Sequence, residues 1–145
     1  MIPPEVPGSE GDVIILKLDP TGSLIWEKTV GGSQRDYAYS VDFLNSGGFV
    51  IGGFSESGDG AIDQNNGSSD TLLMKFSTDG IELWQKTYGG SLSENIHSIG
   101  ISGSGGIFGV GSMQNPLSGN NDLDILLMRY DEAEPILVIH GILTD

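Results

Sequence analysis

One segment occurs three times along the chain, and this repeat constrains the fold more than any other feature. Asp12-Val13-Ile14-Ile15-Leu16-Lys17 recurs 58 residues later as Asp70-Thr71-Leu72-Leu73-Met74-Lys75, and 54 residues after that as Asp124-Ile125-Leu126-Leu127-Met128-Arg129. Between the first two copies the matches continue at later positions: Trp26 and Trp84, Gly31-Gly32-Ser33 and Gly89-Gly90-Ser91, and Gly53 and Gly111. Such a period predicts a sheet-sized unit stacked on copies of itself, because one unit cannot bury its own apolar faces.

The residue pattern within each period predicts strands rather than helices. The 23 glycines are spread along all 145 residues and favour tight turns, since glycine destabilises helix interiors. Gly52-Gly53 predicts a close backbone approach between strands. The apolar runs that follow the three repeated aspartates do not alternate with polar residues, which predicts burial on both faces. In the first period we expect strands over 13–18, 24–30, 37–44 and 49–54.

Several strings resemble known repeats. Gly-Gly-Phe-Val-Ile-Gly-Gly-Phe-Ser-Glu-Ser (47–57), Asp79-Gly80 and Leu-Trp-Gln-Lys-Thr-Tyr-Gly-Gly-Ser (83–91) resemble the β-propeller repeats of secreted and surface proteins of Bacteroidetes-type bacteria, in a kelch-like register. The resemblance implies a bacterial extracellular or cell-envelope protein. Length and copy number then predict an all-β fold, a partial β-propeller of four-stranded antiparallel blades with about two and a half repeats.

This register divides the chain into segments. We expect a lead segment or linker over 1–11, a half blade over 12–30, a full blade over 37–88, an incomplete blade over 96–130, and a tail over 131–145 that supplies a candidate substitute strand. Further blades, from the same parent chain or from other copies, are the expected partners, because an open stack leaves apolar faces and strand edges in water.

Charge and composition exclude several classes of partner. Six Lys and Arg against 20 Asp and Glu give a net charge of -14, which repels nucleic-acid backbones and anionic membrane surfaces. No apolar stretch is long enough for a membrane span, so we expect no membrane insertion. The chain contains no cysteine and therefore no disulfide or thiol nucleophile. No secretion signal is recognisable in its first residues.

Several repeated residues have both a structural and a functional interpretation. Asp12, Asp70 and Asp124 could be ligands around a channel, but an acid before a buried strand more often bonds backbone amides. Trp26 and Trp84 could stack on sugars, but their repetition favours packing between blades. We therefore expect structural roles for all five residues, and for Gly32 and Gly90 in the Gly-Gly-Ser breaks.

One loop carries a candidate metal site. Asp63, Asn65 and Asp70 loosely match a calcium loop, which needs oxygen ligands at alternating positions. The alternative is a solvated turn without metal. No other cofactor is indicated.

The leading functional hypothesis is a non-enzymatic scaffold for protein or glycan binding. Its candidate binding residues lie in two loops of unequal length, because function is often carried by loops on a regular scaffold: Glu56, Asp59, Asn65, Asn66, Gln114, Asn115 and Asn120. The alternative is a fragment of a propeller-containing hydrolase, either glycan-active through central carboxylates or followed by an α/β-hydrolase domain. Ile136-Leu137-Val138-Ile139-His140-Gly141 resembles the strand and His-Gly turn that open such domains, although no G-x-S-x-G motif is present.

Overall fold

All the regular elements are strands. The computed structural model describes residues 11–117, 122–131 and 134–141, and the predicted all-β class is confirmed over these residues. The strands are β1 (Val13–Leu18), β2 (Leu24–Val30), β3 (Asp36–Phe43), β4 (Phe49–Ser55), β5 (Asp70–Phe76), β6 (Glu82–Tyr88), β7 (Glu94–Ile101), β8 (Ile107–Gln114), β9 (Leu123–Asp131) and β10 (Glu134–Gly141).

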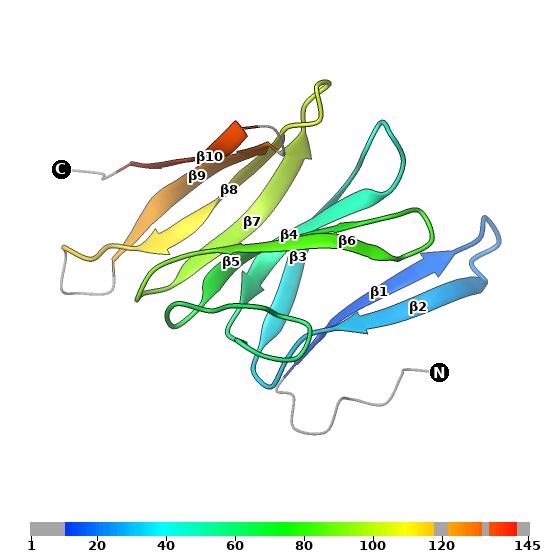
Figure 1. Ribbon diagram of the computed structural model, residues 1–145, viewed down its shortest axis with the longest axis horizontal. Helices are drawn as coiled ribbons and strands as arrows, with labels where there is room; N and C mark the ends of the chain where they lie inside the picture. The colour runs from blue at the N-terminus through cyan, green and yellow to red at the C-terminus, as the bar shows by residue number, and fades with distance from the viewer. Residues whose placement is uncertain (1–10, 118–121, 132–133, 142–145) are drawn as a thin grey trace.

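The strands form three antiparallel sheets that follow one another along the chain (Figure 1). The N-terminal sheet is β1-β2, the central sheet is β3-β4-β5-β6, and the C-terminal sheet is β7-β8-β9-β10. β10 pairs with β9 as β6 pairs with β5, so the backbone of Glu134–Gly141 completes the C-terminal sheet. The two four-stranded sheets therefore share one strand order.

Equivalent hairpins use different turn chemistry. Between β1 and β2, Oδ1 of Asp19 accepts hydrogen bonds from the backbone N–H groups of Thr21 (2.8 Å) and Ser23 (2.9 Å). Between β5 and β6, the Ser77 hydroxyl accepts weaker bonds of 3.2 Å from Asp79 and Ile81. The glycines of both turns have positive φ, 85° at Gly22 and 77° at Gly80, which explains their repetition.

A second repeated glycine marks an irregularity in each four-stranded sheet. The pairing of β3 with β4 shifts between Ala38 and Ser40, and that of β7 with β8 shifts at the equivalent place. A Cβ at Gly53 would lie 1.8 Å from the Tyr37 carbonyl oxygen, and one at Gly111 would lie 1.8 Å from that of Asn95. The close approach predicted at Gly52-Gly53 is confirmed, and only glycine fits there.

Two apolar cores hold the sheets together. The first lies between the N-terminal and central sheets and contains Val13, Val30, Phe49, Ile51, Ile62, Leu72, Met74 and Phe76. The second lies between the central and C-terminal sheets and contains Val50, Leu73, Ile96, Ile107 and Met128. β5 contributes alternate residues to both cores, and each large apolar side chain buried in this way contributes about 1.5–3 kcal/mol.

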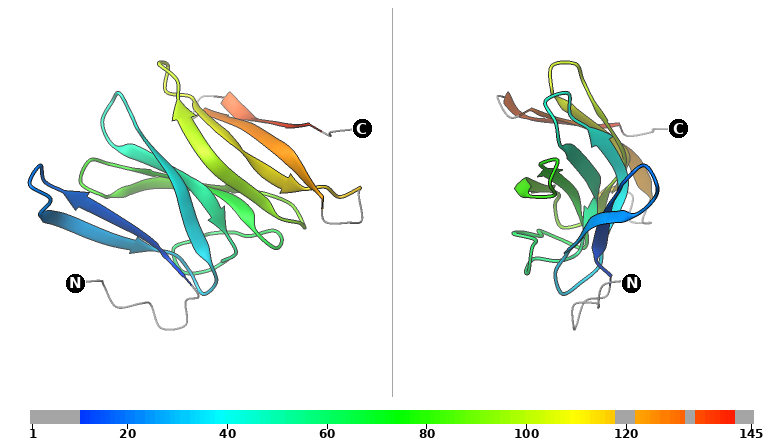
Figure 2. Two further views of the ribbon diagram at one scale, coloured as in Figure 1. Left: turned by 180° about the vertical axis from the view of Figure 1, so that it is seen from behind. Right: turned by 90° about the vertical axis from the view of Figure 1, so that its right-hand side faces the viewer.

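Burial on both faces is correct for β5 and wrong for β1 and β9. In β5 nearly every residue is buried, whereas alternate residues of the other two strands are exposed. We call Ile14, Leu16 and Leu18 the N-terminal end face, and Phe108, Val110, Ile125 and Leu127 the C-terminal end face. In the described part of the chain no further sheet covers either face, and the three sheets stand in a row without closing into a ring (Figure 2).

Candidate functional site

Connecting segments form a continuous polar rim at one end of the sheets, and we take this loop rim as the candidate site. The rim consists of residues 31–35, 56–69, 89–93 and 115–117. Ser69 forms a parallel bridge with Ser93, whose carbonyl accepts a 2.8 Å hydrogen bond from the Gln114 N–H. The backbone N–H of Ala61 donates to the Gly31 carbonyl at 3.0 Å. The two predicted binding loops thus lie along one end of the molecule.

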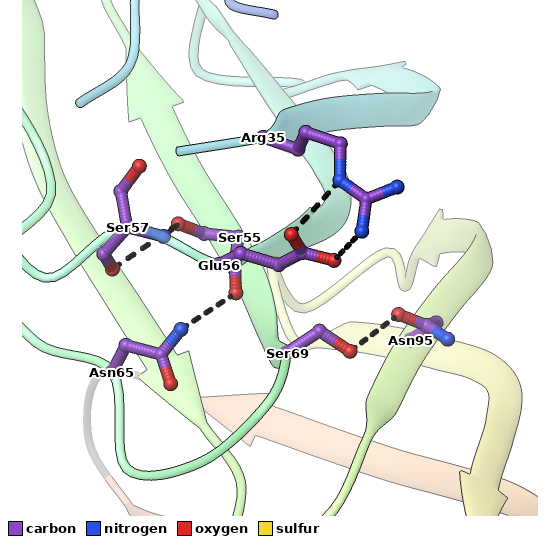
Figure 3. Close-up of polar contacts among 7 residues, drawn as sticks. All are labelled: Arg35, Ser55, Glu56, Ser57, Asn65, Ser69 and Asn95. Carbon is purple, nitrogen blue, oxygen red and sulfur yellow. Dashed lines mark hydrogen bonds and ion pairs between the residues drawn. The ribbon is translucent and has the colours of Figure 1, made fainter. Parts of the chain in front are cut away.

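Glu56 is held by an arginine on the neighbouring segment. Nε and Nη2 of Arg35 donate to its two carboxylate oxygens at 2.9 and 2.8 Å (Figure 3). The arginine is half-exposed, so this bidentate ion pair faces solvent at the rim. A ligand that uses Glu56 must compete with Arg35.

Asn65 and Asn66 stabilise the loop from within. Nδ2 of Asn65 donates to the Ser55 carbonyl at 3.2 Å (Figure 3), and its Oδ1 accepts from the Gly67 N–H at 2.8 Å. The backbone and side-chain N–H groups of Asn66 both donate to Oδ2 of Asp70, at 2.9 and 3.1 Å. Asp63 is exposed. Two of the three predicted calcium ligands, Asn65 and Asp70, therefore already carry hydrogen bonds inside the loop.

Asp59 joins two segments of the rim. Its Oδ1 accepts a 2.8 Å hydrogen bond from the Ser33 N–H. A Cβ at Gly32 would lie 2.5 Å from both this oxygen and the Asp59 carbonyl. Gly32 therefore allows the two segments to touch.

In the second predicted loop, Asn115 makes hydrogen bonds through both its backbone and its side chain. The Asn115 N–H donates to the Asp122 carbonyl at 2.8 Å, and Oδ1 of Asn115 accepts from the Leu117 N–H at 2.8 Å. Gln114 is the last residue of β8. Asn120 lies outside the described residues.

Asp36, which the sequence reasoning did not select, is the centre of a buried polar cluster. Its Oδ2 accepts hydrogen bonds from the Gly32 N–H (2.8 Å) and the Ser57 hydroxyl (2.9 Å), and its Oδ1 accepts from the Ser55 hydroxyl. Ser57 N–H donates to the Ser55 hydroxyl at 3.0 Å (Figure 3). This buried carboxylate is satisfied by donors from both sides, as burial requires.

Glu94, also not selected, is the counterpart of Asp36 and has poorer partners. The Gly90 N–H donates to its Oε2 at 3.0 Å, but the positions equivalent to the two serines are Met113 and Asn115. Burial raises the pKa of the Glu94 carboxyl; the Gly90 hydrogen bond opposes this, and the charge of Asp70 adds to it.

Asp70 and Glu94 form a buried carboxyl pair over Gly89. A Cβ at Gly89 would lie 2.4 Å from Oδ1 of Asp70 and 2.6 Å from Oε2 of Glu94. The two oxygens are therefore within about 5 Å of each other, which is close enough for the charge of Asp70 to contribute to the raised pKa of Glu94. Oδ1 of Asp70 is buried without a hydrogen-bond partner among the described residues.

The other repeated aspartates occupy similar places. A Cβ at Gly31 would lie 2.3 Å from Oδ1 of Asp12 and 2.9 Å from Oδ2 of Asp36, so the carboxyl pair itself is repeated. Asp124 is buried in β9, opposite Met113. The predicted backbone-amide bonding of strand-start acids is seen at Asp70, which accepts from the Asn66 N–H.

Both tryptophans lie against the apolar cores. Trp26 packs on the first core and stacks on Phe49, with ring centroids 6.4 Å apart. Trp84 packs on the second core, with its ring centroid 5.0 Å from that of Tyr130. This placement is the one expected of residues that pack between sheets.

The side-chain contacts described in the rim are hydrogen bonds and the Arg35–Glu56 ion pair. Among the described residues no three His, Asp or Glu side chains converge to hold a metal ion. A helix of the length and apolarity needed to cross a membrane is also not found in that part of the chain. Sequence could have revealed Asp36 and Glu94, because each is an acid four residues after the second glycine of a Gly-Gly-Ser break.

Comparison with known proteins adds no relative. No protein-family model matches the chain, and a search of the curated proteins finds no match.

Proposed function

We propose that this chain is a β-propeller repeat module of a bacterial extracellular or cell-envelope protein, with a non-enzymatic role as a scaffold for protein or glycan binding. In this proposal the central and C-terminal sheets are blades and the N-terminal sheet is the outer half of another. The loop rim is the surface offered to a ligand, and further blades cover the two end faces.

The observation that carries the proposal is a difference in exposure between equivalent residues. Val50 and Leu73 of the central sheet are 0% and 1% exposed because the C-terminal sheet covers them. Their repeat equivalents, Phe108 and Leu127, are 44% and 43% exposed. The C-terminal end face thus repeats the surface that receives a sheet inside the chain, which supports a stack that continues.

The rim supports the binding role. It exposes hydrogen-bonding groups and the Arg35–Glu56 ion pair on a scaffold fixed by buried polar clusters. Amide and carboxylate side chains recognise hydroxyl and amide groups, which glycans and peptides both present. Arrays of glycans and of extracellular peptides are the direct screen, and no binding on either array would contradict the ligand role.

The stacking itself is tested by solution mass. At moderate salt, which screens the net charge of -14, we expect wild-type protein to self-associate with rising concentration. Leu127→Lys should abolish this association. Leu83→Lys is the matched control, because Leu83 is similarly exposed on β6 but lies outside both end faces. A wild-type monomer at all concentrations, or equal effects of the two variants, would contradict the proposal.

A further inference from the structure

A groove opens between β1 and the central sheet. It has a volume of about 780 Å³, and its lining includes Val13, Ile15, Ala38, Val41, Phe43 and Phe49. Val13 and Phe49 also belong to the first core, so the groove continues an interface that already exists between the two sheets.

One side of the groove is a strand edge that no described strand pairs with. Among the described residues β1 pairs with β2 alone, whereas its repeat equivalents β5 and β9 each have a strand on both edges. On that second edge, β4 pairs with β5 and β8 pairs with β9, both antiparallel. The backbone N–H and C=O groups on the free edge of β1 can accept one more strand.

The other side of the groove is a surface that β4 covers elsewhere in the molecule. Ala38 and Val41 are the repeat equivalents of Ile96 and Ile99. Gly52 of β4 lies against those isoleucines, since a Cβ at Gly52 would be 2.5 Å from Cγ2 of Ile99 and 3.3 Å from Cγ2 of Ile96. Ile96 is fully buried and Ile99 is half-buried there, whereas Ala38 is exposed and Val41 is 54% exposed.

We infer that the groove beside β1 is a strand-addition site for a strand pair equivalent to β3 and β4, supplied in trans by another repeat. This inference rests on the proposed repeat function and names one partner of that module. The added strand runs antiparallel to β1, as β4 does to β5. Following the β4–β5 register, it places residues equivalent to Phe49, Ile51 and Gly53 opposite Leu18, Leu16 and Ile14.

The geometry explains why a repeat strand fits better than a general apolar peptide. Within the incoming pair, a side chain at the position of Gly53 would meet the carbonyl of the residue equivalent to Tyr37, which lies 1.8 Å from a Cβ at Gly53, so the incoming strand needs glycine there. It also needs a second strand on its outer edge, because in the central sheet the corresponding edge of β4 is paired with β3.

The test uses a fluorescent synthetic peptide with the sequence of residues 36–55 and the full chain. We expect saturable binding, together with slower hydrogen exchange at alternate amides of Val13–Leu18. Val41→Lys and, separately, Phe43→Lys should weaken binding by about tenfold or more. Leu83→Lys should bind like wild type. Circular dichroism establishes that each variant is folded.

The inference would be overturned by no peptide binding, by equal binding of a peptide with Gly53 replaced by valine, or by unchanged exchange in β1. Equal affinity for a scrambled apolar peptide would indicate that the groove binds apolar peptides without regard to sequence, and it would also overturn the inference. The stacking test uses Leu127, at the opposite end of the molecule. If Leu127→Lys changes the solution mass while the peptide does not bind, the strand-addition site fails and the proposed repeat function stands.

Discussion

The carboxylates of Asp70 and Glu94 converge on Gly89, with oxygens 2.4 and 2.6 Å from the point that a Cβ would occupy. The same arrangement recurs at Asp12, Asp36 and Gly31. In both places two acidic side chains lie against one glycine, and that glycine is in the segment that connects one sheet to the next. This relationship has consequences for stability that can be measured one residue at a time.

Gly89→Ala should destabilise the protein by about 1–3 kcal/mol, because the added methyl group overlaps both carboxyl groups and forces them apart. Its neighbour gives the control: nothing lies within 4 Å of a Cβ at Gly90, so Gly90→Ala should stay within about 0.5 kcal/mol of wild type. Urea denaturation measures both. Equal effects of the two variants would show that the carboxyl pair does not press on Gly89.

Glu94→Gln should change how stability depends on pH. The pKa of Glu94 is raised in the folded state, so its favourable contribution is complete below its usual pKa of 4.5 and is lost as pH rises through the folded pKa. Glutamine has no charge to lose and keeps the acceptor for Gly90. The stability of Glu94→Gln relative to wild type should therefore rise with pH across this window, measured by urea denaturation.

Asp19 provides a control of opposite sign. Hydrogen bonds, chiefly from the Thr21 side chain, lower the pKa of Asp19. Its contribution is present above the usual pKa of 3.8 and is lost as pH falls through the folded pKa. Asp19→Asn should therefore lose stability relative to wild type as pH rises. If both variants followed the same pH trend, the assigned causes would be wrong.

Gly52→Ala should loosen the contact between the central and C-terminal sheets and cost about 1–3 kcal/mol, since its methyl group would collide with Ile99. Gly100→Ala, where a Cβ meets open space, is the matched control on the opposing strand β7. Thermal unfolding compares them. A Gly52→Ala midpoint equal to that of Gly100→Ala would mean that the two sheets do not pack as described.

Calcium removal tests the remaining metal hypothesis. Because Asn65 and Asp70 are engaged by Gly67 and Asn66, we expect a chelator to leave the thermal midpoint unchanged. A midpoint that rises with added calcium, and that Asp63→Asn lowers towards the chelated value, would instead support the loop as a calcium site.

Periodicity predicted the strands well because repeated residues report repeated environments. Trp26, Trp84, Gly53 and Gly111 each recur for a packing reason that holds in both copies. Periodicity failed for the burial of β1 and β9, since identical sequence types differ in exposure according to what stands beside them. Asp36 and Glu94 were missed because the repeat changes the residue from Asp to Glu, which hides the match from a search for identity.

Each sheet interface contains its own tryptophan, and the chain has two in all. Trp84→Phe therefore leaves Trp26 as the fluorophore at the contact between the N-terminal and central sheets. Trp26→Phe leaves Trp84, beside Tyr130, as the fluorophore at the contact between the central and C-terminal sheets. Emission from these single-tryptophan proteins can reveal whether the two contacts melt together or in succession, without any attached label.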